Sequence, residues 1–550
     1  MKRAVVLTAT LSMILFTAFA DAASKGDDAS KPAASGPVDY FNVPDSVTRG
    51  SVNVEGHTVD YKAIAGTITV HPKDWDDAEK ADQGSSGDQA DKSKAPAQAS
   101  NNPTAKAAMF YVAYFKEGEK PGDRPITFLY NGGPGSSTVW LHMGAFGPKR
   151  VKTTDDSHTP AAPYQIVNND YSLLDASDLV FVDAPGTGFS RITGKDKEKA
   201  FYGVDEDAYA FTQFIQSFLT KYNRWNSPKY LFGESYGTPR SAVVINDLET
   251  DDDVDFNGVI LLSQILNFDL SPDGPEANPG VDLPYMIALP TYAATAWYHN
   301  KLPGKRPDQL EPFLQKVEEF ARTRYLLALE GGANLPNKER SYIAEKLHEY
   351  TGLPVSYILK ADLRINGGEF EKNLQDSADL TTGRLDTRFS GPTIDPLSKE
   401  ADYDPQSAAI SSAYVSAFNN YARTDLNYGQ NEVYNPEINV FKYWDFKHKQ
   451  PGQEFAFSQT TNVMPDLALA MKYNPDLKVM LNGGYFDLAT PFYEGWYEMH
   501  HLPIPHDLQS NISYAYYQSG HMVYAHEESL AKLHDNVANF IRSTDNLNNR

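Results

Sequence analysis

The segment from residue 178 to residue 262 alternates short apolar runs with stretches of helical spacing, and this rhythm strongly constrains the fold. The apolar runs cover residues 178–183, 229–232 and 258–262, and the helical stretches cover residues 205–222 and 241–248. Strands that alternate with helices favour a mainly parallel sheet with helices on both faces. We therefore expect an α/β fold.

Antiparallel strands are expected before this segment. Residues 51–70 alternate apolar and polar side chains around Gly56 and Gly66, which predicts a meander of short strands, and strand character resumes at residues 108–115 and 125–130. The intervening residues 71–108 contain no Val, Ile, Leu, Met or Phe. Such a stretch buries too little apolar surface to offset its ordering entropy, so it predicts a disordered insertion.

Residues 275–425 interrupt the alternation. Apolar residues with helical spacing predict one helix over residues 310–321 and a second over 338–350, which ends before Gly352. An irregular stretch, residues 367–403, follows. The α/β rhythm returns with strand-like residues 478–481 and 513–517 and a helix-like segment 527–541. These patterns predict one α/β domain in two parts, residues 51–274 and 426–550, with a mainly helical insertion between them.

The N-terminus has the pattern of an export signal. Basic residues 2–3 precede an apolar run at residues 4–16 and the small residues Ala18, Ala20 and Ala22. The apolar run is too short to span a bilayer, which takes roughly 20 residues. We therefore expect a cleaved signal peptide over residues 1–22, a flexible segment over 23–50, and no stable membrane association. The bacterial periplasm or the exterior fits best as the location.

Composition narrows the chemistry. The 550 residues include no cysteine, so disulfides, thiolate nucleophiles and metal–thiolate sites are excluded. The 49 Lys plus Arg stand against 72 Asp plus Glu, a formal charge of −23, which argues against a nucleic-acid partner. No metal or cofactor is predicted, and the sequence does not reveal the oligomeric state.

The sharpest local signal is the G-x-S-x-G sequence at residues 233–237, between a strand-like run and a helix-compatible stretch. Glycines on both sides of Ser235 allow the strand to turn sharply into the helix and leave the hydroxyl exposed. A surface turn with an idle serine is the alternative. The strand before the motif favours Ser235 as a nucleophile.

A serine nucleophile requires a base and a group that orients the base, and in this fold class both follow it in chain order. Asp487 and His521 each lie in a loop directly after a strand-like run, so we predict them as orienting acid and base. His526 is the second candidate for the base. The clustered histidines 500, 501 and 506 have no carboxylate at metal-ligand spacing and are read as surface residues.

Two backbone N–H groups are expected to stabilise the oxyanion of an acyl-transfer reaction. One belongs to Tyr236, the residue after the nucleophile. The other is expected from the glycine-rich loop at residues 131–135, and we predict Gly133. A phosphate-binding loop is the competing interpretation of this sequence, but the Gly-Lys-Ser/Thr ending is missing.

Four motifs together resemble the serine carboxypeptidase family of the α/β-hydrolase fold. They lie in chain order at residues 131–137, 181–190, 233–237 and 520–523. The resemblance implies a central, mostly parallel sheet with an inserted cap. It also implies a peptidase that removes residues from the C-terminus of peptides, with Ser235, Asp487 and His521 as its triad.

The resemblance also implies a site for the substrate's terminal carboxylate. In the family this group is held by an Asn and two Glu residues, of which Asn131 and Glu234 are present. The second Glu falls on Ala145, so the usual carboxyl pair that shares a proton cannot form. We name His142 as one candidate for the missing group. The family's typical Cys in the first motif is here Ser136.

Three functions follow from these patterns. The first is a serine carboxypeptidase acting on peptides. The second is an esterase or acyltransferase with the same triad, which the missing Glu favours. The third is a non-catalytic binding protein on a hydrolase scaffold, because a fold does not fix a function.

Overall fold

The computed structural model describes residues 39–76, 102–457 and 460–547. The signal peptide expected at residues 1–22 lies outside the described residues, as does most of the insertion expected at 71–108. The described residues from Tyr40 onward form one compact unit, so the sheet and the helical insertion belong together. Among the described residues, none of the helices has the length and apolar character needed to cross a membrane.

A ten-stranded sheet organises this unit, with the strand order β1-β2-β3-β7-β4-β9-β10-β13-β14 and β8 paired with β3. The strands are β1 (Ser46–Val54), β2 (His57–Val70), β3 (Lys106–Lys116), β4 (Ile126–Tyr130), β7 (Asp178–Val182), β8 (Arg191–Thr193), β9 (Lys229–Glu234), β10 (Gly258–Leu262), β13 (Lys478–Gly484) and β14 (Ile512–Tyr517). Neighbouring strands from β7 to β14 are parallel, whereas β1, β2 and β3 are antiparallel. The predicted α/β fold is confirmed.

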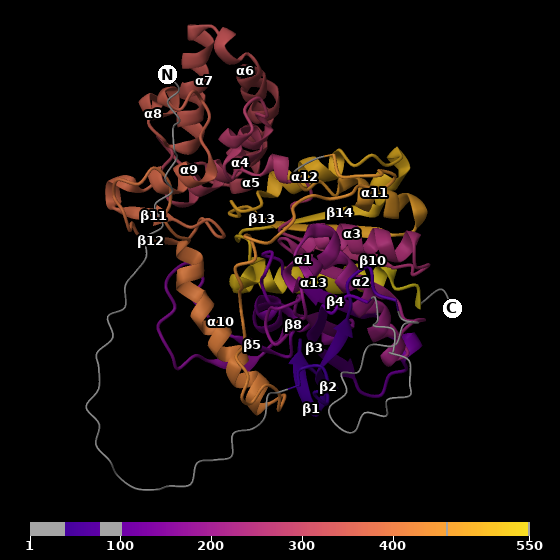
Figure 1. Ribbon diagram of the computed structural model, residues 1–550. Coiled ribbons are helices and arrows are strands. Elements are labelled where there is room, and N and C mark those ends of the chain that lie inside the picture. Colours follow the sequence, from indigo (N-terminus) through magenta and orange to yellow (C-terminus); the bar gives the residue numbers. More distant parts are fainter. Residues whose placement is uncertain (1–38, 77–101, 458–459, 548–550) are drawn as a thin grey trace, which may run out of the picture. The chain divides into compact units, whose positions relative to one another are not determined.

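Alternate residues of each strand face opposite layers of helices. Phe110, Phe232 and Ile260 belong to one apolar cluster, whereas their neighbours Tyr111 and Leu231 belong to the other. The first cluster includes residues of α10 (Pro405–Thr424), α13 (Glu527–Thr544) and the π-helical turn η2 (Leu141–Phe146), and the second those of α2 (Val204–Lys221), α3 (Gly237–Thr250) and α11 (Met464–Tyr473). The sheet is therefore covered on both faces (Figure 1).

A third apolar cluster unites the helices of the insertion with α12 (Phe492–His500). These helices are α4 (Leu283–Tyr298), α5 (Leu310–Phe320), α6 (Leu326–Glu330), α7 (Asn337–Thr351), α8 (Val355–Lys360) and α9 (Gly367–Asn373), which lie together in Figure 1. Helix α7 ends at Gly352, whose φ of +71° is the left-handed conformation expected of a terminating glycine. The two helices expected from spacing are confirmed.

The remaining short elements are α1 (Lys197–Phe201), the pair β5 (Lys149–Val151) and β6 (Ile166–Asn168), and the pair β11 (Leu380–Thr382) and β12 (Ser390–Pro392). The last pair lies in the stretch 367–403, for which no regular structure was expected. Helix α10 lies within the expected insertion, residues 275–425, yet its apolar residues join the first cluster with the sheet. By packing, the insertion therefore ends before α10.

The expected strand boundaries need three corrections. Strand β1 begins at Ser46, inside the segment 23–50 expected to be flexible, because Ser46 to Gly50 pair with residues 61–65 of β2. Strand β3 begins at Lys106, inside the expected insertion. Gly66 lies within β2 and not at a turn. A Cβ at this position would lie 2.0 Å from Asp45 Oδ1, so no larger residue fits there. Its role is therefore close packing.

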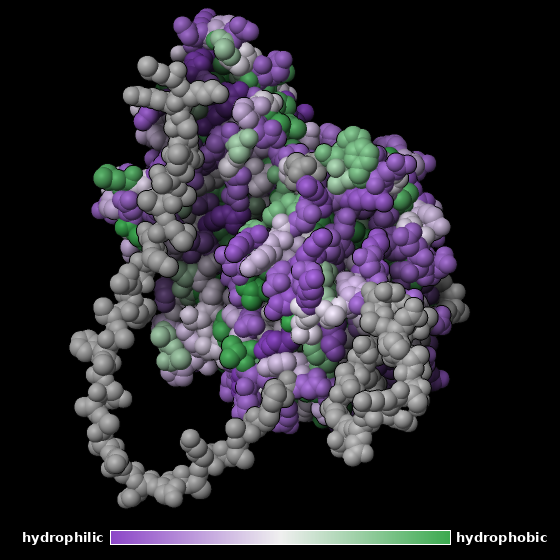
Figure 2. Space-filling model, in the orientation of Figure 1, coloured by the Kyte–Doolittle hydropathy of each residue, from purple (hydrophilic) through white to green (hydrophobic). Residues whose placement is uncertain are grey.

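The surface in Figure 2 is mostly hydrophilic, with apolar residues in small patches. This agrees with the formal charge of −23. Large apolar side chains are exposed after α10 at Phe441, Tyr443, Phe455 and Phe457, and the rings of the last two lie 4.6 Å apart.

Candidate active site

Ser235 lies at a sharp turn between β9 and α3. Its φ is +60°, and its backbone N–H donates to the carbonyl oxygen of Leu262 on the neighbouring strand at 3.0 Å. The turn requires its glycines, because a Cβ on Gly233 would lie 2.1 Å from the carbonyl oxygen of Gly237. This backbone leaves the half-buried Ser235 at the carboxyl end of the sheet, as the motif predicts.

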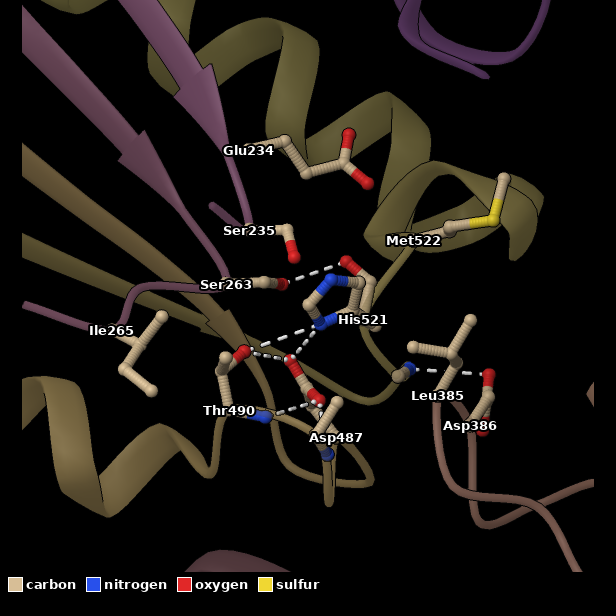
Figure 3. Close-up of polar contacts among 12 residues, drawn as sticks. Glu234, Ser235, Ser263, Ile265, Leu385, Asp386, Asp487, Thr490, His521 and Met522 are labelled. Atoms are coloured by element: carbon tan, nitrogen blue, oxygen red, sulfur yellow. Dashed lines mark hydrogen bonds and ion pairs between the residues drawn. The ribbon is translucent and has the colours of Figure 1, made fainter. Parts of the chain in front are cut away.

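His521 and Asp487 form a hydrogen-bonded pair in the loops that follow β14 and β13. The distance from His521 Nδ1 to Asp487 Oδ2 is 2.8 Å, and Asp487 is fully buried (Figure 3). Burial alone would lower the pKa of His521, but the charge and hydrogen bond of Asp487 raise it. Because Nδ1 is engaged by Asp487, Nε2 is the nitrogen left for another partner.

Thr490 completes the environment of the acid. Its Oγ1 donates to Asp487 Oδ2 at 2.8 Å and lies 3.2 Å from His521 Nδ1. The backbone N–H groups of Ala489 and Thr490 each donate to Asp487 Oδ1 at 3.0 Å. Three donors hold one buried carboxylate, so its position is fixed.

The backbone of His521 is held from two sides. Its N–H donates to the carbonyl oxygen of Leu385 at 2.6 Å. Its carbonyl oxygen accepts from Ser263 Oγ at 2.7 Å (Figure 3). The preceding Gly520 N–H donates to Asp386 Oδ2 at 3.2 Å. The main chain that carries the imidazole is therefore held by the insertion as well as by a loop of the sheet.

A cavity of about 440 Å³ opens over these residues. Ser235, His521, Glu234 and Asn131 line it together with apolar side chains from several loops. The apolar lining consists of Trp140, Tyr236, Ile265, Phe268, Leu385, Phe441, Phe446 and Met522. The site thus combines an apolar enclosure with a few convergent polar groups, as ligand sites do.

The loop at residues 131–135 packs directly on the turn of Ser235. A Cβ on Gly132 would lie 2.3 Å from the backbone nitrogen of Tyr236, so only glycine fits there. Gly133 has a φ of +104°. In the part of the chain that the structure describes, the N–H groups of Gly133 and Tyr236 donate to no protein acceptor. Both are thus available to a ligand oxygen in the cavity.

Glu234 is a buried carboxyl group at the cavity wall, next to Ser235 in the chain. Burial raises its pKa to about 7. Tyr524 Oη lies 3.1 Å and 2.9 Å from its two carboxylate oxygens. The Asn131 side chain adjoins both groups, because it hydrogen-bonds to Glu234 and to Tyr524, and its Oδ1 accepts from the N–H of Leu141 at 3.1 Å.

His142 is not a substitute for the missing second Glu, and that prediction is wrong. Its Nε2 is 2.8 Å from Tyr114 Oη, and its ring stacks on Phe181 with centroids 4.3 Å apart. Burial lowers its pKa to about 3. His142 lies in the core beneath β3 and does not line the cavity, because its side chain points toward the sheet. Ala145 is also buried there.

The other histidine candidates lie elsewhere. His526, the second candidate for the base, has its Nδ1 2.9 Å from Ser529 Oγ at the start of α13 and does not line the cavity. His500, His501 and His506 are exposed. Within the described residues, the one group with metal-ligand proximity is Glu55, His534 and Asp535, which is separate from the cavity lining.

Several supporting residues were not predicted from the sequence. Ser263 and Tyr524 contact His521 and Glu234 across chain separations of 258 and 290 residues. Thr490 follows its partner Asp487 closely enough to suggest an Asp-centred turn. The motif at residues 181–190 has a structural role: Asp183 Oδ1 accepts from the N–H of Thr138 at 2.8 Å and so holds the loop that carries Gly133.

Comparisons with known proteins agree with this geometry. Residues 99–267 match the family model described as "Serine carboxypeptidase". Serine carboxypeptidase-like 36 of Arabidopsis thaliana is 28% identical over 242 residues, which are 42% of this chain and 46% of that protein. Pheromone-processing carboxypeptidase KEX1 of Phytophthora infestans is 32% identical over 144 residues, 24% of this chain and 22% of that protein. The chain thus spans less than half of the length of these relatives.

Solved structures are similar to the chain only distantly. The match to a proline iminopeptidase of Mycobacterium smegmatis includes 80% of this chain and 96% of that protein, with 13% identity and a TM-score of 0.34. The match to the peroxisomal α/β-hydrolase Lpx1 of Saccharomyces cerevisiae includes 87% of this chain and 89% of that protein, with 10% identity and a TM-score of 0.31.

The parallel sheet, the strand–turn–helix around Ser235 and the buried Asp487–His521 pair are those of the α/β-hydrolase fold. Within this fold, the match of residues 99–267 to a family model points to one family. Over residues 99–267 the chain is similar to the serine carboxypeptidase family, and its relatives with that name match it over parts of their length.

Proposed function

We propose that the protein is a serine-type carboxypeptidase, which hydrolyses the C-terminal peptide bond through an acyl-enzyme on Ser235. The observation that carries this proposal is the place of Glu234. A buried carboxyl group adjoins the nucleophile and lines the same cavity as Ser235 and His521. A carboxyl group of raised pKa can donate a proton to a substrate's terminal carboxylate, which an ionised one would repel.

In this mechanism His521 Nε2 accepts the proton of Ser235 as its oxygen attacks the scissile carbonyl carbon. Asp487 holds the other ring nitrogen and stabilises the imidazolium that forms. The N–H groups of Gly133 and Tyr236 donate to the resulting oxyanion. His521 then protonates the leaving amine, and water, activated by the same base, releases the acyl group.

Asn131 and Glu234 are proposed to bind the terminal carboxylate of the substrate. Both line the cavity beside Ser235, and the amide nitrogen of Asn131 supplies a further donor. A site that holds this carboxylate places only the last peptide bond at the nucleophile, which explains why cleavage would proceed from the C-terminus.

A fluorophosphonate probe tests the nucleophile. We expect the wild-type protein to be labelled and the Ser235→Ala variant to remain unlabelled. Equal labelling of both proteins, or no labelling of the wild type, would show that Ser235 is not an activated nucleophile. The second result would favour a binding protein on a hydrolase scaffold.

An esterase or acyltransferase is the second candidate. Ala145 favours it, because only one of the two usual carboxyl groups is present to bind the substrate's carboxylate. Cleavage of esters together with no cleavage of a blocked peptide that has a free C-terminus would support this candidate. Loss of the C-terminal residue from that peptide supports the carboxypeptidase.

We also propose that the protein is exported, to the bacterial periplasm or the exterior. The basic, apolar and small residues of segment 1–22 support this, and the absence of cysteine makes the fold independent of disulfides. N-terminal sequencing of the protein from the cells that make it should find a start just after residue 22. An intact Met1 would contradict export by this signal. Peptides are the proposed partners, and nucleic acids are not expected.

A further inference from the structure

We propose that Tyr524 is a positioning residue for carboxylate recognition and takes the place of the acid that Ala145 lacks. Its hydroxyl holds Glu234 so that the Glu234 carboxyl and the Asn131 amide together bind the substrate's terminal carboxylate. This inference rests on the proposed function and names the group that completes the same site.

The contact is direct and buried. Tyr524 lies in the short helical turn η10 (Val523–Ala525), closely after His521, and its Oη donates to Glu234 at 3.1 Å and 2.9 Å. Tyr524 is 3% exposed and Glu234 is 2% exposed. A hydrogen bond to a buried carboxyl group has no competing water, so it fixes the rotamer of Glu234.

The segment that lacks the acid also provides room for the Tyr524 ring. Gly144 adjoins Ala145 in the turn η2, and a Cβ on Gly144 would lie 2.7 Å from Tyr524 Cδ2. The same Cβ would lie 2.6 Å from Tyr414 Cε1. The ring of Tyr524 therefore packs against bare backbone, and its hydroxyl end reaches Glu234 from that side.

Tyr524 changes the chemistry of recognition as well as the packing. Two carboxyl groups that share a proton bind a third carboxylate only while that proton remains. Burial raises the pKa of Tyr524 further above its usual range, so its hydroxyl is a donor at every physiological pH. It can donate to one oxygen of Glu234 while the other, protonated oxygen donates to the substrate.

Recognition should therefore follow the ionisation of one group, Glu234. The groups that face Glu234 are His521 and Asp487 from the sheet loops, Tyr524 from η10, Asn131, and Tyr414 from α10. His521 also titrates and serves every substrate as the base. Its contribution cancels in the ratio of kcat/KM for a peptide with a free C-terminus to kcat/KM for the amide of that peptide.

The experiment measures this ratio against pH for a blocked dipeptide and its amide. In the wild type the ratio should favour the free acid and fall with a one-proton dependence as pH rises through the pKa of Glu234. In Tyr524→Phe the ratio should fall about tenfold at low pH, mainly through KM. Its midpoint should move to higher pH, because a donor to ionised Glu234 has been removed.

Tyr414→Phe is the matched control. Tyr414 packs on the same glycine but has no hydrogen bond to Glu234 among the described contacts, so its variant should keep the wild-type ratio and midpoint. Thermal unfolding of both variants reports whether the fold is kept. A purely structural role for Tyr524 would slow acid and amide cleavage equally and leave the midpoint unchanged.

Three results would overturn the inference. The first is a folded Tyr524→Phe protein with the wild-type ratio and midpoint. The second is loss of the ratio in Arg384→Gln instead, since Arg384 also lines the cavity and is a cation that could bind the carboxylate. The third, absence of any Ser235-dependent cleavage, would also remove the proposed function, whereas the first two leave it intact.

Discussion

The backbone N–H of His521 donates to the carbonyl oxygen of Leu385 at 2.6 Å, so the insertion and the loop of the proposed base are joined by a main-chain hydrogen bond. The next residue, Asp386, accepts from Gly520 and pairs with Arg388, whose Nε lies 3.0 Å from Asp386 Oδ1. The segment at residues 385–388 therefore supports the loop that carries His521, and its Leu385 also lines the cavity.

Asp386→Ala should destabilise the protein and impair catalysis together. The substitution leaves the buried Arg388 guanidinium without its carboxylate, which costs about 3–5 kcal/mol in comparable buried pairs. It also removes the acceptor of the Gly520 N–H, so the loop that carries His521 is held less firmly. Denaturant unfolding and kcat measured on the same preparation would check this.

The exposed ion pair of Lys532 and Glu528 provides a control for Asp386→Ala. Glu528→Ala should change the stability little, because water and salt screen an exposed pair. A stable, fully active Asp386→Ala protein would show that the insertion does not position His521.

Thr490→Val should lower kcat with little change in KM. The substitution removes the hydroxyl that donates to Asp487 Oδ2 at 2.8 Å while it keeps the volume of the side chain. A hydrogen bond to a charged group contributes about 1.5–3 kcal/mol, so a loss of roughly 10- to 100-fold is expected. Thr490→Ser keeps the hydroxyl and should retain most of the activity. Equal losses in both variants would contradict a role for the hydroxyl.

Gly132→Ala should disturb the oxyanion site and leave the rest of the fold intact. A Cβ at this position would lie 2.3 Å from the backbone nitrogen of Tyr236, so the two loops must separate. We expect slower labelling by a fluorophosphonate and a kcat reduced about 100-fold, the usual effect of losing an oxyanion donor.

Gly367→Ala is the matched control for Gly132→Ala, because its Cβ would have no neighbour nearer than 3.5 Å. This variant should label at the wild-type rate. Unchanged labelling of Gly132→Ala would mean that its loop does not contribute to the oxyanion site.

The environment of His448 predicts that the stability of the protein depends on pH. Its Nδ1 lies 2.6 Å from Asp205 Oδ1 and its Nε2 lies 2.8 Å from Asp466 Oδ2. Burial alone would lower its pKa, but the hydrogen bonds and charges of the two carboxylates raise it from 6.5 to about 9. The stabilisation is therefore complete below the unfolded pKa of 6.5 and is lost as pH rises through about 9.

The Tm of the wild type should accordingly fall by several degrees between neutral pH and about pH 9. In His448→Gln this part of the pH dependence should disappear, and the Tm at neutral pH should already be lower. Parallel Tm profiles of the two proteins would contradict the charged state assigned to His448.

Patterns of local sequence predicted the sheet core well, and they placed the residues of the proposed triad in loops that follow strands. Spacing of apolar residues located β10 at its observed bounds, and the rule of chain order located Asp487 and His521 after the strands that carry them. Helix α4 was missed because it is buried on nearly all sides and contains Pro290, so it has no polar face to give a helical period.

The supporting contacts could not be predicted, because they join distant parts of the chain. Tyr524 meets Glu234, and Leu385 meets His521, only after the sheet and the insertion have packed. The position of His142 could not be predicted for a related reason: it lies three residues before Ala145 in the chain, which suggested the cavity, but the turn η2 directs its ring toward Tyr114.

The most direct test of the central claim is a timed digest of one blocked peptide with a free C-terminus beside its C-terminal amide, with wild-type protein and Ser235→Ala. We predict that the wild type releases residues one by one from the free acid, much more slowly from the amide, and that Ser235→Ala releases none. Cleavage within the peptide, equal cleavage of acid and amide, or release by Ser235→Ala would contradict the account.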